Sequence, residues 1–319
     1  MKPRLYRFLG FAMRENVLKL LLRKLIQGLL MLLAVSAITF VLLSKAGGDA
    51  FSSLRDNPQV SEATIERLRI VYGLDKPLAA RYGNWLTSAL RGNLGESFQF
   101  SVPVASLVWI RFLNTLLLAG IALLIAIVLS AAMSILSVRL RNAKLSAAIE
   151  FLILVTSSTP RIVLALFALA LTVRFSGLAL QTGNFSSIIL AAIVLAIPLI
   201  SLFLAQTHES LSQAMKEDFI KLARAKGLSE FIVIFRHASR AAIGPLLTLF
   251  GLSLGALLGG SVIVETVLGW PGIGALMVAA VRSRDLPVVM GVVLAASAAV
   301  WFGNALAEVL QMTNDKRLR

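Results

Sequence analysis

Six long apolar stretches constrain the fold of this chain more than any other feature of its sequence. Each has about 20 or more residues, the length that an α-helix needs to cross the hydrocarbon core of a bilayer. Of the 319 residues, 58% are hydrophobic and only 15% are charged, which excludes an ordinary water-soluble enzyme and a disordered chain. The sequence therefore predicts an all-α membrane protein with six transmembrane helices, at residues 25–44, 112–138, 145–173, 186–206, 243–267 and 287–311.

The distribution of lysine and arginine predicts the orientation of these helices. Seven basic residues lie in segment 1–24, three in 139–144, six in 207–240 and three in the tail 312–319. Loops rich in lysine and arginine stay on the cytoplasmic side of the membrane. We therefore expect both termini in the cytoplasm and segment 45–111 on the external side. The net charge of +15 then reflects membrane topology, and a nucleic-acid partner is not expected.

The basic N-terminal segment has a role of its own in this interpretation. Segment 1–24 has the pattern of an amphipathic helix that lies on the inner leaflet of the membrane. A cleaved secretory signal is the alternative, but the following apolar run exceeds the usual length of about 7–15 residues and no A-x-A site follows it. We therefore expect a transmembrane domain over residues 25–311, with 312–319 as a cytoplasmic tail.

The chain lacks the motifs of an enzyme. The Gly-Lys pair of a phosphate-binding P-loop does not occur, so we expect no ATP hydrolysis by this chain itself. HExxH and cysteine are absent, and there are only two histidines. The segment Gly251-Leu252-Ser253-Leu254-Gly255 has GxSxG spacing, but it lies inside an apolar helical stretch and not at the strand-to-helix turn of a nucleophile elbow. The sequence predicts a membrane conduit or scaffold with no catalytic residue, no metal site and no cofactor of its own.

The cytoplasmic loop 207–240 is long and has a helical pattern. Apolar residues recur at helical spacing from Phe219 to Ala223, and Gly227 is placed to end that helix. A second short helix is expected from about Ser229 to Arg236, again with apolar residues. A helix-turn-helix with apolar faces and a basic rim can dock into the groove of a partner protein. Packing against its own helix bundle is the alternative interpretation.

Five short motifs, in order along the chain, are typical of one transporter family. They are Gly48-Asp49, Gly73-Leu74-Asp75-Lys76-Pro77 with Gly92-Asn93-Leu94-Gly95-Glu96-Ser97, the EDFIKLARAKGL segment from Glu217 to Leu228, Glu265 to Gly274, and Arg284 to Val289. Together they resemble the permease subunits of binding-protein-dependent ABC importers, closest to the dipeptide, oligopeptide and nickel branch. Lys221 and Leu222 stand where sugar importers carry the Glu and Ala of their EAA motif, which favours the peptide branch.

The resemblance implies a type I permease fold and a division of labour between subunits. A second homologous permease subunit would complete the pore, and two ABC ATPase subunits would bind ATP and magnesium. An extracytoplasmic solute-binding protein would deliver the solute. The chain would be a multi-pass protein of the bacterial inner membrane, embedded in lipid. The coupling to the ATPases would pass through Glu217, Asp218, Lys221, Ala223, Arg224, Ala225, Gly227 and Leu228.

Two further places are candidates for the translocation pathway or its gate. Arg161 follows Pro160 inside the third apolar stretch, where a charge must face protein or water. It would contact an anionic solute, pair with Glu150 or a carbonyl, or extend to the membrane surface. The resemblance implies an external gate or re-entrant segment at Glu265, Trp270, Pro271 and Gly272, with a helix cap or an interfacial anchor as the alternative.

Three glycines lie on one face of the fifth apolar stretch. Gly251, Gly255 and Gly259 form a GxxxGxxxG pattern, which lets membrane helices approach closely. We expect helix packing there, within the subunit or at a seam with a second subunit.

Function is predicted as the permease half of an ABC importer for di- or oligopeptides. Import of nickel or a metal chelate is an alternative within the same family. A stand-alone secondary transporter or channel would show inverted repeats or paired broken helices, and no clear internal symmetry is present. An adaptor that binds lipid or partners without transport is a further alternative.

Overall fold

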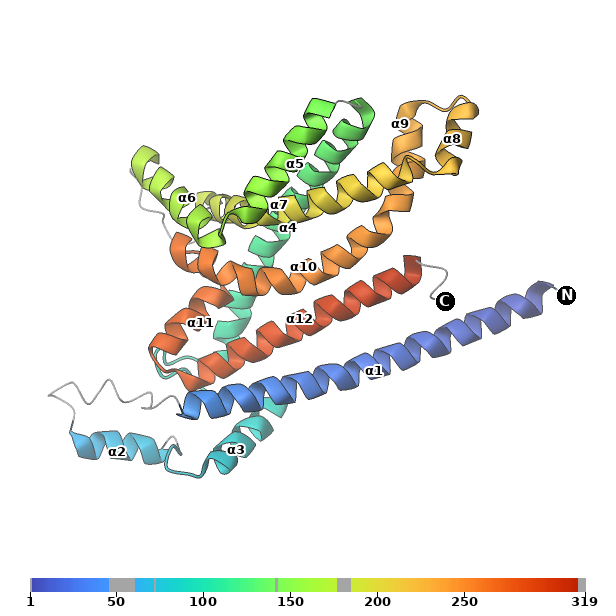
Figure 1. The fold of residues 1–319 in the computed structure, drawn as a ribbon. Helices are drawn as coiled ribbons and strands as arrows, with labels where there is room; N and C mark the ends of the chain where they lie inside the picture. Colours follow the sequence, from blue (N-terminus) through green and yellow to red (C-terminus); the bar gives the residue numbers. More distant parts are fainter. Residues whose placement is uncertain (1, 46–60, 72, 141–142, 177–184, 315–319) are drawn as a thin grey trace. The chain divides into compact units, whose positions relative to one another are not determined.

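The computed structural model describes residues 2–45, 61–71, 73–140, 143–176 and 185–314 of the chain. The described part is helical, with an isolated bridge between Glu96 and Pro103 and no strand, so the predicted all-α class is confirmed. Its helices, labelled in Figure 1, are α1 (Lys2–Lys45), α2 (Glu62–Val71), α3 (Leu78–Leu90), α4 (Val104–Leu140), α5 (Ala143–Ser158), α6 (Arg161–Ser176), α7 (Phe185–Ala214), α8 (Asp218–Ala225), α9 (Glu230–Ile232), the π-helical turn η2 (Val233–Ala238), α10 (Ser239–Leu268), α11 (Ile273–Arg282) and α12 (Leu286–Asn314).

Five described helices are long and apolar enough to cross a membrane, or six if one bent pair counts as a single span. They correspond to the six predicted stretches, with α1, α4, α7, α10 and α12 as the unbroken ones. Helix is the backbone state to expect in lipid, since only internal hydrogen bonds can satisfy the peptide groups there. Helix α1 also continues without a break from the predicted N-terminal segment into the first span.

The predicted third span, 145–173, is two helices rather than one interrupted helix. Helices α5 and α6 meet at an angle of 94°. Pro160 lies at the break, because proline lacks an N–H and disfavours helical backbone at the residue before it. Its carbonyl accepts the N–H groups of Val163 and Leu164 at 3.0 and 3.3 Å and so starts α6. Pro198 and Pro245 lie inside α7 and α10 without ending them.

The chain divides into two compact units. The first unit consists of Met1–Leu113 and Leu276–Trp301, and the second of Asn114–Ala275 and Phe302–Arg319. In the first unit, α3 packs on α1, where the hydroxyl of Tyr82 lies 2.9 Å from that of Ser36. The predicted external segment 45–111 supplies α2 and α3 of this unit.

The second unit has a core of small side chains. Helices α4, α6, α7 and α10 contribute to one buried cluster that includes Ala119, Ala122, Ala191, Ala192 and Ala196. Association of helices in lipid relies on close van der Waals packing, which small residues permit. This core supports α10, whose two ends carry the predicted functional segments.

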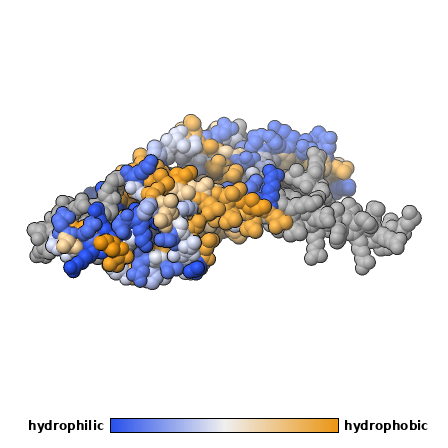
Figure 2. All heavy atoms as spheres, turned by 90° about the horizontal axis from the view of Figure 1, so that it is seen from below, coloured by the Kyte–Doolittle hydropathy of each residue, from blue (hydrophilic) through white to orange (hydrophobic). Residues whose placement is uncertain are grey.

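Large apolar side chains also cover much of the outside of the protein. Along α1, Leu25, Leu30, Ile38 and Leu42 are each more than half exposed. Figure 2 shows hydrophobic residues, in orange, gathered on the surface seen from below. Exposed apolar surface of this extent marks a membrane or protein contact. We infer that these exposed apolar side chains face lipid where the helices cross the bilayer.

Candidate functional site

The predicted cytoplasmic hairpin is present in the structure. Helix α8 ends at Ala225, and Gly227 follows with φ of +75°, a left-handed backbone that glycine adopts most readily. The Gly227 N–H donates to the Arg224 carbonyl at 2.9 Å and the Leu228 N–H to the Ala223 carbonyl at 3.3 Å. The chain then turns back through α9 and η2 into α10. The predicted glycine stop and the second helical segment are therefore confirmed as backbone geometry.

One face of this hairpin packs on the helices that carry it. Ile220, Ala223 and Val233 are buried in a cluster with residues from the ends of α7 and α10. Leu228 and residues near the end of α4 pack against the same cluster. The sequence interpretation missed Ile220 and Val233, although Ile220 lies three positions before Ala223, at helical spacing, and Val233 lies within the apolar run of the second helix. The alternative interpretation, that the loop packs against the helices of its own chain, is therefore correct for one face of the hairpin.

The other face carries large apolar side chains that nothing in the second unit covers. Phe219 is 42% exposed, Leu222 56%, and Phe231 60%. Phe235 is half exposed, and its ring centroid lies 4.4 Å from that of Phe231. Such a patch of aromatic and aliphatic side chains on a short rigid hairpin has the anatomy of a protein-binding surface. We call this set, together with Ile232, the outer hairpin face.

Two ion pairs lie on the hairpin. Arg224 Nε lies 2.8 Å from Glu230 Oε1, which joins α8 to α9. Lys221 and Asp218 form a second ion pair of 2.8 Å within α8, and Glu217 precedes the helix as its N-cap residue. Ala225 is exposed near the turn. The predicted coupling residues thus lie together in one compact element.

The predicted gate segment begins with a fully buried carboxylate at the other end of α10. Glu265 Oε1 accepts the hydroxyl of Thr115 at 2.7 Å. Its Oε2 accepts the backbone N–H groups of Gly274 and Ala275 at 2.7 and 3.0 Å, at the start of α11. Thr115 also accepts the N–H of Ile273 at 2.8 Å. The carboxylate therefore caps α11 and ties it to α4, which agrees with the predicted helix cap more closely than with an exposed anchor.

The turn after Glu265 brings the backbone at Gly272 close to the Glu265 carboxyl group. A Cβ atom at Gly272 would overlap the Glu265 carboxyl group, so only glycine fits there. The Trp270 indole N–H donates to the Asn114 carbonyl at 3.1 Å, and the Asn114 side chain donates to the Pro271 carbonyl at 2.8 Å. Trp270 is only 6% exposed, so it belongs to the buried core of the second unit and not to an aromatic belt at the membrane surface. Together these residues form the structure that we call the Glu265 turn.

Asn114 and Thr115 were missed from sequence. Their signal was present, because they are adjacent polar residues within an otherwise apolar stretch, where a buried polar group needs a partner. What the sequence did not provide was the distance in space to residues about 150 positions later.

Arg161 lies against α10 at the sharp bend between α5 and α6. A Cβ atom at Gly260 would overlap the Arg161 guanidinium in its present position, so the end of the arginine side chain lies directly against this glycine. Among the described residues no ion pair joins Arg161 to Glu150, which does not support that alternative. Arg161 is also the first residue of α6, where the helix dipole disfavours a cation. Gly260 lies eight positions before the end of α10 at Leu268.

The predicted glycine face of α10 is used only in part. A Cβ atom at Gly251 would overlap Ala307, so this glycine allows α10 and α12 to touch within the second unit. Gly255 is half-buried, whereas Gly259 is exposed and has open space where a Cβ would be. The tight contact toward the Leu268 end of the helix is made by Gly260, which the sequence pattern did not include.

The first unit contains a second buried carboxylate, which the sequence interpretation did not assign. Asp285 Oδ2 accepts the hydroxyl of Ser97 at 2.6 Å and the N–H of Gln99 at 3.0 Å, and Asp285 precedes α12. This contact joins the Gly92–Ser97 motif to the Arg284–Val289 motif. Among the described residues, no cluster of His, Asp or Glu could hold a metal ion.

Comparison with known proteins agrees with these features. Residues 126–319 match the family described as "Binding-protein-dependent transport system inner membrane component", and residues 17–119 match the N-terminal domain of such components. A peptide permease protein of Brucella suis biovar 1 (strain 1330) is 35% identical over 95% of this chain and 99% of its own length. The oligopeptide transport system permease protein AppB of Bacillus subtilis (strain 168) is 30% identical, over 93% and 98%.

A peptide transport system permease protein of Brucella abortus (strain 2308) is similar to the chain to the same degree, with 33% identity over 94% of the chain and 98% of its own length. The matches cover all the described helices that can cross a membrane. This chain therefore belongs to the family of inner-membrane components of binding-protein-dependent transport systems, and it is a multi-pass protein of the inner membrane.

Proposed function

We propose that this chain forms half of a translocation pathway for di- or oligopeptides in an ABC importer. Two ATPase subunits, which bind ATP and magnesium, drive the cycle, and an external binding protein delivers the peptide. A second homologous permease subunit completes the pathway. The names of the similar proteins, all of them peptide permeases, support peptides over nickel or a metal chelate. Membership of a binding-protein-dependent family argues against a stand-alone transporter, channel or adaptor.

The outer hairpin face carries this proposal. A membrane subunit without a P-loop has to receive its driving force through a contact with another chain. The outer hairpin face offers apolar side chains for such a contact, and Ile220 and Val233 fix the hairpin to the bundle beneath it. The hairpin continues through η2 directly into α10, so a movement of a docked ATPase is passed to a transmembrane helix. With the hairpin in the cytoplasm, both termini lie there as well.

The pathway residues follow from the same arrangement. Arg161 is held against Gly260 with a charge that the membrane and the helix dipole both disfavour. A peptide carboxylate beside Arg161 would offset both the cost of the charge in the membrane and its repulsion by the helix dipole. Beyond it, the Glu265 turn closes the end of α10 and acts as a hinge or gate element of the external side.

The first test is directed at the outer hairpin face. The double substitution Phe231→Ala with Phe235→Ala removes two half-exposed rings while the buried face stays intact. We expect the variant to fold and insert normally, to lose ATPase subunits on purification, and to lose ATP-driven peptide uptake in proteoliposomes. Phe151→Ala is the matched control, because Phe151 on α5 is 68% exposed and lies outside the hairpin. Uptake that needs an ion gradient and no ATPase would refute the proposal.

The second test separates the pathway role of Arg161 from packing. Gly260→Ala pushes on the guanidinium, whereas Gly259→Ala meets open space on the same helix. We expect Gly260→Ala to reduce uptake of peptides with a free C-terminal carboxylate more than uptake of their amidated forms. Gly259→Ala leaves both unchanged. Equal losses for the two peptide forms would show that Arg161 has a packing role only.

A further inference from the structure

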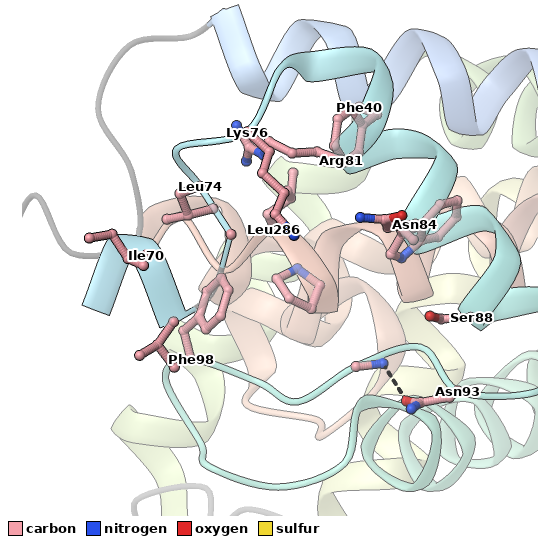
Figure 3. A pocket seen from close by; sticks show the side chains of 15 residues that line it. Phe40, Ile70, Leu74, Lys76, Arg81, Asn84, Ser88, Asn93, Phe98 and Leu286 are labelled. Atoms are coloured by element: carbon pink, nitrogen blue, oxygen red, sulfur yellow. Dashed lines mark hydrogen bonds between the residues drawn. The ribbon is translucent and has the colours of Figure 1, made fainter. Parts of the chain in front are cut away.

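A cavity of about 360 Å³ lies inside the first unit and is lined only by residues of that unit. Its walls come from the end of α1, from α2 and α3, from the loop near Asn93 and from the start of α12. Figure 3 shows Lys76, Arg81 and Asn84 on one side of this space, with Leu286 facing them. Lys76 and Asn84 are exposed, so the cavity is open to its surroundings.

The polar groups of this cavity select for an anion. Two cations, Lys76 and Arg81, line it, and none of the described lining residues is an aspartate or glutamate. The Arg81 guanidinium lies 5.7 Å from the Phe40 ring centroid, which restricts its position by a cation–π contact. The indole N–H of Trp85, another lining residue, is buried and has no hydrogen-bond acceptor. A buried donor without a partner is destabilising, and an anion in the cavity would supply the acceptor.

The cavity lies at the level where two membrane helices end. Phe40 is five residues from the end of α1 at Lys45, and Leu286 and Pro287 begin α12. Beside it, the rings of Tyr82 and Trp85 stack at 5.9 Å, as aromatic residues do at the boundary between lipid and water. This is the depth at which lipid headgroups lie, and two cations at that depth can pair with the phosphate of an anionic lipid in the external leaflet.

The neighbouring surface is suited to acyl chains. Only 17% of the residues in the most apolar part of α1 are buried inside the protein, compared with 33 to 56% in the other unbroken spans. Val41, next to Phe40 on α1, is 36% exposed, and Ile70 and Val71 on α2 are 58% and 77% exposed. At the cavity itself, Ile70 and Val71 add an apolar wall. A free phosphate ion would make no use of these apolar surfaces.

We propose that this cavity binds the phosphate headgroup of an anionic phospholipid, with its acyl chains along the exposed face of α1. Lys76 and Arg81 pair with the phosphate, and the Trp85 indole donates a hydrogen bond to a headgroup oxygen. The bound lipid fixes α3 to α1, in addition to the Tyr82–Ser36 contact. The proposal is independent of the transported solute.

The test measures lipid binding to the full-length protein. The purified chain is reconstituted in nanodiscs that contain phosphatidylglycerol and phosphatidylcholine in equal amounts, and lipid retained after extraction is counted by native mass spectrometry. We expect one tightly held phosphatidylglycerol per chain. Because each cation near a membrane surface contributes about a factor of five to anion affinity, Lys76→Gln with Arg81→Gln is expected to lower this retention about 30-fold. Trp85→Phe, which keeps the ring and removes the N–H, lowers it by less.

The control removes the same charge elsewhere in the first unit. Arg67 and Arg91 belong to the same segment of the chain, are exposed, and do not line the cavity. Arg67→Gln with Arg91→Gln is expected to retain the lipid as wild type does. Equal loss in both double variants would overturn the proposal in favour of diffuse surface attraction.

Three further outcomes would also overturn it. Unchanged retention in the Lys76 and Arg81 variant places the lipid elsewhere. The melting temperature of the wild type is also measured with inorganic phosphate, with the soluble peptide acetyl-Leu-Glu-amide and with phosphatidylglycerol. If phosphate raises it and phosphatidylglycerol adds nothing, the cavity binds a free anion. If the peptide raises it and phosphatidylglycerol adds nothing, the cavity binds an acidic protein segment. The monodisperse elution of each variant on size exclusion verifies its folding.

Discussion

The two ends of α10 use the same kinds of residue for opposite purposes. At the hairpin end, Gly227 has open space around it and the neighbouring aromatic side chains are exposed. At the other end, Gly272 is crowded by a carboxylate whose donors are all within the second unit. The hairpin end leaves apolar side chains exposed, whereas the polar groups at the other end are satisfied within the second unit. A helix of 30 residues joins them, so it can pass a movement from the adaptable end to the fixed one.

The largest expected effect comes from breaking the fixed end. Glu265→Ala leaves the Thr115 hydroxyl and the N–H groups of Gly274 and Ala275 without their shared acceptor. Each buried donor that loses its acceptor costs about 1–3 kcal/mol, and three donors lose theirs here. We expect the variant to be unstable in thermal unfolding of the purified protein. A melting temperature equal to that of wild type would mean that this end is not fixed by the carboxylate.

Crowding the same turn tests its shape without removal of a polar group. Gly272→Ala places a methyl group against the Glu265 carboxyl group, whereas Gly259→Ala meets nothing within 4 Å. Overpacking of a tight site destabilises by about 1–3 kcal/mol. We expect a lower free energy of unfolding for Gly272→Ala alone, measured by the same thermal assay. Similar stability of both variants would contradict the close approach at the turn.

The adaptable end predicts a different type of defect. Gly227→Val forces a branched side chain into left-handed backbone, at a local cost of about 1–2 kcal/mol. Because the space around Gly227 is open, we expect the fold to survive and the direction of α9 to change. Uptake of peptide per ATP hydrolysed is then reduced in proteoliposomes, while ATP hydrolysis continues. An unchanged ratio would argue against docking at the hairpin.

Some backbone features of the fold could be predicted from sequence and others could not. Apolar length predicts the spans, and Gly227 predicts the hairpin turn, because both are local signals. The bend at Pro160 was recognised as an interruption, but its angle of 94° depends on packing with α7 and α10.

Contacts between distant segments could not be predicted from one sequence. Glu265 was identified by its motif, yet its partner Thr115 lies 150 residues earlier, and Asp285 meets Ser97 over a separation of 188 residues. Arg161 was identified as a charge in an apolar run, whereas Gly260 became visible only when two helices were placed side by side. Pairing in space is the information that periodicity and composition lack.

The smallest expected effect sharpens the comparison within the hairpin. The Lys221–Asp218 pair is 69% and 95% exposed and lies inside one helix, whereas the Arg224–Glu230 pair is 30% and 49% exposed and joins two. Exposed pairs contribute about 0.2–1 kcal/mol and less at high salt. We expect Arg224→Gln to destabilise slightly and to reduce coupling, and Lys221→Gln to leave the unfolding temperature unchanged. If both variants keep wild-type coupling at low and high salt, the hairpin keeps its shape through Ile220 and Val233 alone, and the charges serve only the contact with a partner.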